Sequence, residues 1–258
     1  MKAEAKLLVV TGCGGGLGAK LLANFLDQGF HVLAVIRDAS QLNEEAQAHL
    51  GNRLNVLELD LASVGAGRQI ALKVSSLLNA GLSLDAVLFN AAVHYGSAVE
   101  SMDLDRARDI MDVNFYSVLS AAQCLIPILK KQGFGKLLAI SSLSAHIGLE
   151  NDAIYSASKA ALERLFECLD VELAPLGISV GIVIPGAFYS GLIKGSMDYS
   201  QEKVAALNEV VVAVSNFIAD DLDGFARPGN QQAKVVLGVL SGKTAKERQQ
   251  LARSWSCL

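Results

Sequence analysis

Short runs of almost uninterrupted apolar residues recur along the chain, separated by longer segments of mixed polarity. These runs occupy residues 6–11, 31–36, 55–59, 85–89, 136–141 and 178–184. A strand with one face in water alternates apolar and polar residues, whereas a parallel strand that is covered on both faces is apolar throughout. The pattern therefore predicts parallel strands in the interior of a sheet.

The segments between these strands have the apolar periodicity of amphipathic helices. The clearest of them cover residues 19–28, 66–81, 105–132 and 158–177. Helical runs end at Gly29, Gly133 and Gly177, and glycine is common where a helix stops. Strands that alternate with helices predict an α/β fold, a Rossmann-type doubly wound parallel sheet.

The chain has 258 residues, and we expect residues 1–258 to form a single domain. Beyond Pro185 the pattern changes, because residues 187–230 contain helical stretches and no further strand. We interpret this segment as a helical insertion on the substrate side. The tail from Lys234 onward looks helical, so we expect no closing strand near residues 244–256.

The composition favours a soluble protein with a small ligand. Hydrophobic residues make up 52% of the chain, enough for a continuous core, and the formal net charge is −4. Nucleic-acid-binding surfaces usually carry a basic excess, so we expect no nucleic-acid partner. No apolar run approaches the length that spans a bilayer, and no cleavage-like site follows the N-terminus. We expect a cytoplasmic protein without a membrane partner.

The cysteines and histidines lack the spacing of a metal site. The cysteines are far apart and form no CxxC pair, so they predict free thiols; they are Cys13, Cys124, Cys168 and Cys257. The histidines lie in different segments, and we expect no metal. Two of them follow predicted strand ends, and we assign these two, His94 and His146, to the substrate pocket, with plain polar loop residues as the alternative.

A glycine cluster, TGCGGGLGAKLL, follows the first predicted strand and leads directly into a helix. Glycines at such a turn let backbone N–H groups approach a pyrophosphate, which the helix N-terminus then stabilises. We expect this turn to bind a dinucleotide through Gly12, Gly14, Gly16, Leu17 and Gly18. A plain glycine-rich connection would explain Gly14 equally well.

The end of the second predicted strand bears on the choice of dinucleotide. A carboxylate near this position usually binds the ribose 2′-hydroxyl of NAD, whereas an arginine can pair with the 2′-phosphate of NADP. Arg37 stands directly after the strand, which favours NADP(H). Asp38 leaves NAD(H) open, because it could bind a hydroxyl itself or pair with Arg37.

Polar residues also follow the third and fourth predicted strands. Asp60 could orient the adenine together with the amide of Leu61, although a helix N-cap is an alternative role. Asn90 and Ala91 follow the fourth strand, at the edge where doubly wound folds bind ligands. We expect the cofactor ribose to lie against them, and turn chemistry is the alternative for Asn90.

Tyr155 and Lys159 are spaced i, i+4, which places both side chains on one face if the segment is helical. A nearby ammonium stabilises a phenolate, so we expect it to lower the pKa of the tyrosine toward the working range. Tyrosine could then donate a proton to a reduced carbonyl. Ser142 follows the fifth strand and could bind the carbonyl oxygen, although spacing alone does not choose it over Ser141 or Ser144.

These motifs together resemble the short-chain dehydrogenase/reductase family, in its smaller, classical group. The resemblance extends from residue 6 to about residue 190 and includes the glycine pattern, the segment Asn90-Ala91-Ala92 and YxxxK at Tyr155. It implies a catalytic tetrad of Asn114, Ser142, Tyr155 and Lys159, with the serine thirteen residues before the tyrosine.

The resemblance also implies further contacts to the cofactor. Lys159 would bind the nicotinamide ribose, Asn114 would hold a kink and a water in a proton relay, and Pro185-Gly186 matches the PG motif of the family. Ser190 matches the residue that touches the nicotinamide amide or the phosphate. Relatives form dimers or tetramers, so a homodimer or homotetramer is implied, although the missing last strand puts the C-terminal subunit contacts in doubt.

We predict an NADPH-dependent oxidoreductase that interconverts a ketone or aldehyde and an alcohol. The substrate is a small molecule, and Ser142, His94, His146, Phe188 and Tyr189 are expected to contact it. One alternative is an NAD-linked alcohol dehydrogenase of the same family. Another is a sensor or scaffold that binds NADP(H) without turnover.

Overall fold

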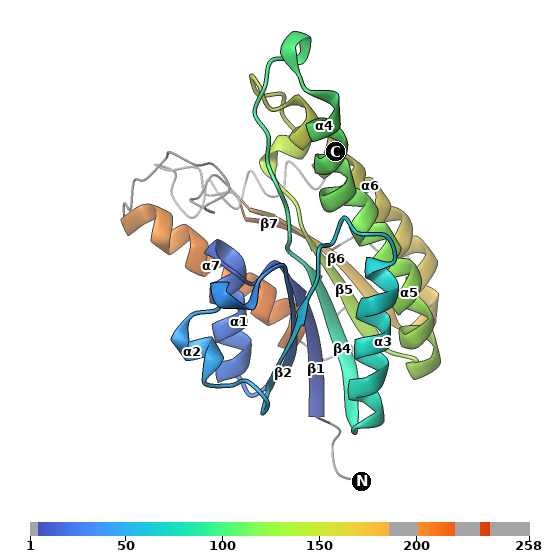
Figure 1. Cartoon of the computed structure of the whole chain (residues 1–258). Coiled ribbons are helices and arrows are strands. Elements are labelled where there is room, and N and C mark those ends of the chain that lie inside the picture. Colours follow the sequence, from blue (N-terminus) through green and yellow to red (C-terminus); the bar gives the residue numbers. More distant parts are fainter. Residues whose placement is uncertain (1–4, 186–200, 220–232, 238–258) are drawn as a thin grey trace, which may run out of the picture.

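The computed structural model describes residues 5–185, 201–219 and 233–237, and its centre is one parallel sheet of seven strands (Figure 1). The strand order across the sheet is β3-β2-β1-β4-β5-β6-β7. The strands are β1 (Ala5–Thr11), β2 (His31–Ile36), β3 (Leu54–Glu58), β4 (Leu82–Phe89), β5 (Gly135–Ile140), β6 (Ile178–Pro185) and β7 (Ala233–Leu237). The six strands predicted from apolar runs and the doubly wound α/β fold are confirmed.

Helices cover both faces of the sheet (Figure 1). The α-helices are α1 (Gly16–Asp27), α2 (Glu44–Gln47), α3 (Ala66–Asn79), α4 (Leu104–Met111), α5 (Ser117–Gln132), α6 (Ala153–Leu173) and α7 (Gln201–Ala219). One core cluster lies between the sheet and α3, α5 and α6, and the other lies between the sheet and α1 and α7. The protein is therefore a three-layer α/β structure.

Alternating side chains of one strand supply both clusters. In β1, Leu7 and Val9 pack into the cluster with α3, α5 and α6, while Leu8 and Val10 pack into the cluster with α1. All four side chains are fully buried or nearly so. This two-sided burial is the reason that the strand reads as a continuous apolar run.

The helical reading of the tail from Lys234 is wrong for residues 233–237. These residues form β7, which pairs in parallel with β6 and places Val235 opposite Val183. A run as short as AKVVL fits either a strand or a helix, so periodicity alone could not decide between them. Residues 238–258, including the segment where we expected no closing strand, lie outside the described residues.

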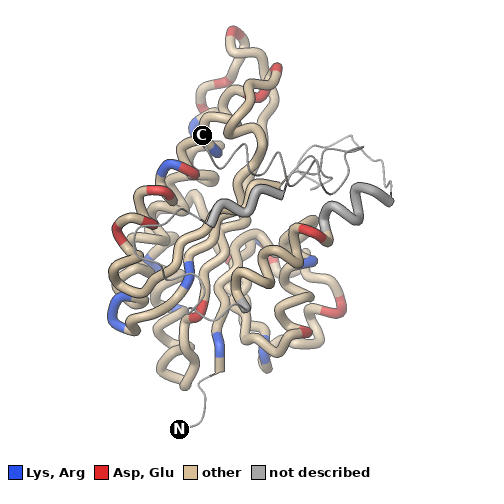
Figure 2. Tube along the Cα trace, turned by 180° about the vertical axis from the view of Figure 1, so that it is seen from behind, with Lys and Arg blue, Asp and Glu red and all other residues tan. Residues whose placement is uncertain are grey.

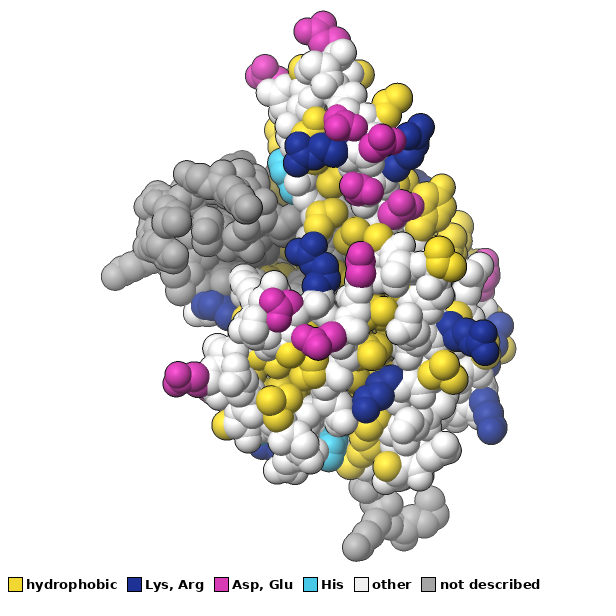
Figure 3. Space-filling view, viewed as in Figure 1, with side chains coloured by type: hydrophobic (Ala, Val, Ile, Leu, Met, Phe, Trp, Pro, Cys, Tyr) yellow, Lys and Arg dark blue, Asp and Glu magenta, His cyan; other side chains and the backbone are white. Residues whose placement is uncertain are grey.

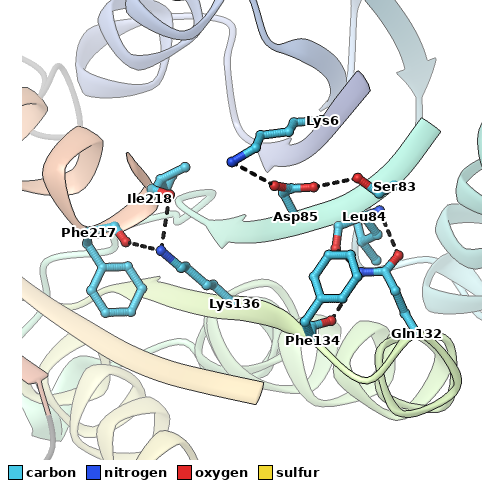
Figure 4. Close-up of polar contacts among 9 residues, drawn as sticks. All are labelled: Lys6, Ser83, Leu84, Asp85, Gln132, Phe134, Lys136, Phe217 and Ile218. Carbon is cyan, nitrogen blue, oxygen red and sulfur yellow. Dashed lines mark hydrogen bonds and ion pairs between the residues drawn. The ribbon is translucent and has the colours of Figure 1, made fainter. Parts of the chain in front are cut away.

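α7 belongs to the segment 187–230 that we interpreted as a substrate-side insertion. Its side chains Val210, Val214 and Phe217 are buried in the cluster that α1 lines. Lys136 of β5 binds the C-terminal end of α7, because its Nζ donates hydrogen bonds to the carbonyls of Phe217 (2.7 Å) and Ile218 (3.1 Å) (Figure 4). This part of the segment is thus a crossover helix that covers the sheet between β6 and β7, and residues 187–200 and 220–230 lie outside the described residues.

The helix predicted at residues 105–132 is interrupted in the structure. A turn of π-helix, Asp112–Tyr116, separates α4 from α5. Among the described residues, the stretch Leu104–Gln132 is the one that has the length and composition to cross a membrane. Its side chains Val118, Leu125 and Leu129 belong to the core cluster under α5, as in a core helix of this length.

Charged side chains of both signs are spread over the described surface. Basic and acidic residues both occur along the outer helices (Figure 2), and apolar and charged groups are interspersed on the opposite view (Figure 3). Neither view shows a face of the described part of the chain that carries one sign of charge alone.

Candidate active site

The candidate site lies at the edge of the sheet where the strands end. In Figure 1 the segments that follow β4 and β5 rise above this edge, and α6 begins there. β1, β4, β5 and β6 are consecutive neighbours in the sheet, so their carboxyl ends lie side by side. The glycine turn, Asn90, Ser142 and Pro185 follow or end these strands.

The glycine turn after β1 is too tightly packed for side chains at two positions. Gly12 has φ +73°, and a Cβ there would lie 2.7 Å from the Cα of Ala91. A Cβ on Gly18 would lie 2.0 Å from the carbonyl oxygen of Gly12. Glycine at these two positions lets the turn, the start of α1 and the end of β4 come together.

The same turn leaves room for an anion at the start of α1. Nothing lies within 4 Å of the position of a Cβ on Gly15, the N-cap residue of α1. No side chain caps this helix, and its first turn contains no acidic residue. The exposed N–H groups and the partial positive charge of a helix N-terminus suit a phosphate, so a dinucleotide pyrophosphate fits these residues.

Asn90 holds the glycine turn against the end of β4. Its Nδ2 donates hydrogen bonds to the carbonyls of Thr11 (3.1 Å) and Gly12 (2.9 Å). The Oγ1 of Thr11 accepts hydrogen bonds from the backbone amides of Asn90 and Ala91, both at 3.1 Å. The side chain of Asn90 thus has a structural role of its own beside the expected one toward a ribose.

The ends of β2 and β3 carry one exposed arginine and two carboxylates that accept hydrogen bonds from the backbone. Arg37 is exposed, and no ion pair joins it to Asp38 in the described part of the chain. Asp38 accepts a hydrogen bond from the amide of Ser40 (2.8 Å), and hydrogen bonds from Ser40 lower its pKa. Glu58, at the end of β3, accepts a hydrogen bond from the amide of Ala39 (2.6 Å), a contact that the sequence did not suggest.

Asp60 is engaged in its own turn. Its Oδ1 accepts a hydrogen bond from the amide of Ala62 (3.1 Å), and its side chain is exposed. It does not cap α3, because that helix begins at Ala66 after Gly65. Leu61 packs against the core cluster under α3.

Asn114 lies in the π-helical turn between α4 and α5, and its side chain is buried. Its Oδ1 accepts from the amide of Val93 (2.8 Å), and its Nδ2 donates to the carbonyl of Val93 (2.9 Å) and to Oγ of Ser158 (3.0 Å). Asn114 therefore joins the loop after β4 to α6. A π-turn is frequent at functional sites.

Tyr155 and Lys159 lie on the same face of α6. The Nζ of Lys159 is 5.8 Å from the centroid of the tyrosine ring and donates a hydrogen bond to the carbonyl of Ile140 (2.9 Å). The hydroxyl of Ser142 forms a hydrogen bond with the phenol of Tyr155. The structure thus brings Ser142, Tyr155 and Lys159 together where β5 ends.

The pKa of Tyr155 shifts in the direction opposite to the one we expected. Burial raises it to about 12, the hydrogen bond with Ser142 lowers it, and the charge of Asp152 raises it further. Burial also lowers the pKa of Lys159 to about 8, while the charge of Glu163 raises it. The expectation was wrong because loss of solvent outweighs the attraction of an ammonium that binds the carbonyl of Ile140 instead of the phenol.

Glu163 is a buried carboxylate that the sequence reasoning missed. It accepts a hydrogen bond from Oγ of Ser141 (2.5 Å), and its Oε2 lies 3.0 Å from Nε2 of His146. His146, which we assigned to the substrate, therefore points its Nε2 at α6. The i, i+4 spacing of Lys159 and Glu163 was the available signal.

His94 lies beside the candidate acid. Its ring packs edge to face on the ring of Tyr155, with centroids 5.0 Å apart, and its Nε2 is 2.7 Å from Oδ1 of Asp152. Asp152 is buried and also accepts a hydrogen bond from Oγ of Ser156 (3.1 Å). Asp152 had not been singled out, because it stands three residues before the YxxxK motif.

Pro185 is the last residue of β6 and is buried. Its backbone pairs with Leu237 of β7. The other residues predicted after it lie outside the described residues; they are Gly186, Phe188, Tyr189 and Ser190.

Solved structures of similar fold include nucleotide complexes. A short chain dehydrogenase from Burkholderia cenocepacia in complex with NADP has a TM-score of 0.73 and 25% identity, covering 99% of this chain and 94% of that chain. An alcohol dehydrogenase from Thermococcus sibiricus complexed with 5-hydroxy-NADP has a TM-score of 0.77 and 18% identity, covering 93% of this chain and 99% of that chain. At that identity the second likeness concerns the fold alone.

Sequence comparisons agree with the structural ones. A family model described as short chain dehydrogenase matches residues 6–199. A short-chain dehydrogenase/reductase of Pestalotiopsis microspora is 31% identical over 253 residues, which make up 95% of this chain and 83% of that protein. The chain belongs to the short-chain dehydrogenase/reductase family of oxidoreductases.

Proposed function

We propose that the protein is an NADPH-dependent reductase that interconverts a ketone or aldehyde and the corresponding alcohol. The observation that carries the proposal is that Ser142, Tyr155 and Lys159 come together where β5 ends: Ser142 is close enough to affect the pKa of Tyr155, and Nζ of Lys159 lies 5.8 Å from the centroid of the tyrosine ring. These groups stand at the sheet edge that also carries the anion-compatible start of α1.

The glycine turn, Arg37 and Lys159 would hold the cofactor. The start of α1 would bind the pyrophosphate, exposed Arg37 the 2′-phosphate, and Lys159 the nicotinamide ribose. When bound, NADPH supplies the hydride. NADP in a solved relative at 25% identity supports this choice of cofactor.

Ser142 and Tyr155 would act on the carbonyl oxygen. Ser142 donates a hydrogen bond to this oxygen as its negative charge grows, and Tyr155 transfers its proton there. A pKa raised to about 12 keeps the phenol protonated at neutral pH, which reduction requires. The reverse reaction needs the phenolate instead.

Lys159 and Asn114 would support the tyrosine. An ammonium near the ring stabilises the phenolate left after proton transfer. Asn114 fixes the loop after β4 and α6 in one geometry through its hydrogen bonds to Val93 and Ser158. This geometry places the rings of His94 and Tyr155 against each other.

The direct test follows NADPH consumption by absorbance with a panel of aliphatic, aromatic and cyclic ketones and aldehydes. Turnover with at least one class, with one alcohol formed for each NADPH consumed, is the expected result. Tight binding of NADPH without consumption across the panel would overturn the proposal in favour of a sensor or scaffold.

An NAD-linked alcohol dehydrogenase is the second candidate, and one observation favours it. The carboxylates of Asp38 and Glu58 lie where β2 and β3 end, and a carboxylate in this region can accept a hydrogen bond from a ribose hydroxyl. Comparison of NADH and NADPH dissociation constants separates the two candidates.

A further inference from the structure

Glu163 is a buried charged residue that the proposed mechanism leaves unused. Its side chain is only 6% exposed, and it lies one turn beyond Lys159 on α6. A carboxylate is costly to bury unless it is paired and hydrogen-bonded. Its partners therefore show what the charge does in the fold.

Two partners of Glu163 come from the segment after β5. Ser141 donates its hydroxyl hydrogen to Oε1, and Nε2 of His146 lies 3.0 Å from Oε2. Ser142 stands between them in sequence, and its hydroxyl reaches Tyr155. Glu163 therefore connects the segment that carries Ser142 to the helix that carries Tyr155.

Glu163 also acts on Lys159 through its charge. The i, i+4 spacing places the carboxylate and the ammonium on one face of α6, and both are buried. His146, from the segment after β5, lies 3.0 Å from Glu163, and Glu167, which pairs with Arg164, follows one turn further on α6. Burial disfavours the ammonium, and the negative charge of Glu163 opposes this effect.

We propose that Glu163 is a positioning residue of the active site, which holds the Ser141–Ser142 segment against α6 and keeps Lys159 in its ammonium form. Its consequence for turnover rests on the proposed reductase function, but its effect on Lys159 does not. The site would then work as one unit in which a single carboxylate sets the placement of the serine and the charge of the lysine.

The test titrates Lys159 directly. Lysines labelled with carbon-13 at Cε are followed by NMR from neutral to alkaline pH, and Lys159→Arg assigns the signal. In Glu163→Gln the midpoint of Lys159 moves to lower pH than in the wild type, because the ammonium loses its negative neighbour. The matched control is Glu167→Gln on the same helix, which leaves the midpoint in place. An unmoved midpoint in Glu163→Gln overturns the proposal.

Two further variants keep the test decisive. Glu163→Asp retains the charge and should bring the midpoint back toward the wild-type value. If Glu163→Gln does not fold, Glu163→Met fills the same space without charge, and the same downward shift is expected. If the wild type consumes no NADPH while the midpoint still shifts, the proposed function fails and the role of Glu163 toward Lys159 stands.

Discussion

His94 and Tyr155 pack edge to face, with ring centroids 5.0 Å apart and an interplanar angle of 67°. Nε2 of His94 also lies 2.7 Å from Oδ1 of Asp152. Burial raises the pKa of Tyr155, and the negative charge of Asp152 raises it further. The acidity of the candidate proton donor thus depends first on its burial and then on a carboxylate that lies outside the YxxxK motif.

Replacement of Asp152 by asparagine should lower the pKa of Tyr155. A negative neighbour disfavours the phenolate, so its removal makes ionisation easier. Ultraviolet difference titration measures the phenolate, with the Tyr155→Phe spectrum subtracted. Asp105→Asn, an exposed position on α4, is the control and should leave the titration unchanged. A pKa that is unchanged or higher in Asp152→Asn would contradict this prediction.

Two glycines of the turn after β1 should respond differently to alanine. At Gly18 the added Cβ meets the carbonyl oxygen of Gly12 at 2.0 Å, so we expect a loss of stability of about 1–3 kcal/mol. At Gly15 the space is open and φ is extended, so stability should change little. Thermal unfolding measures the first effect.

The Gly15→Ala variant should still lose nucleotide affinity. Its methyl group occupies the space at the start of α1 where a phosphate would lie. Isothermal titration with NADPH tests this expectation beside the melting curves. Wild-type affinity in a stable Gly15→Ala protein would show that the pyrophosphate does not bind at the start of α1.

Lys159 should make stability depend on pH in the alkaline range. Burial lowers its pKa from 10.5 to about 8, so between these values the unfolded chain binds more protons at this site than the folded one. Stability therefore rises with pH across this window. The difference between the unfolding free energies of the wild type and of Lys159→Met should therefore increase by up to roughly 3 kcal/mol as the pH rises through this window. Denaturant unfolding at several pH values would refute this if the difference stays flat.

Arg37 should decide between the two dinucleotides. If its exposed guanidinium pairs with the 2′-phosphate, Arg37→Ala weakens NADPH binding about tenfold or more and leaves NADH binding unchanged. Fluorescence titration with each cofactor measures both constants. Equal losses for NADH and NADPH would instead assign Arg37 a general structural role and favour the NAD-linked candidate.

The sheet could be predicted from the sequence because a strand that is buried on both faces is apolar at successive positions. Leu7 to Val10 alternate between two core clusters, and every one of them must be apolar. β7 escaped prediction because Ala233–Leu237 is a short strand that, among the strands the structure describes, neighbours β6 alone. Its pairing with β6 depends on residues far away in sequence.

The motifs of the candidate site were visible, but their surroundings were not. Spacing placed Tyr155 and Lys159 on one face of a helix, yet it carried no information on the solvent that each loses on folding. Burial decides both pKa shifts, and it follows from tertiary packing. The partnerships of Glu163 with His146 and of Asp152 with His94 join separate segments for the same reason.

The most direct measurement compares turnover and cofactor binding in Tyr155→Phe. With a carbonyl substrate from the panel, this variant should lose at least about 100-fold in NADPH consumption, because the phenol no longer supplies the proton. Its dissociation constant for NADPH should stay within about twofold of the wild-type value. A Tyr155→Phe protein that consumes NADPH at the wild-type rate would show that another group donates the proton.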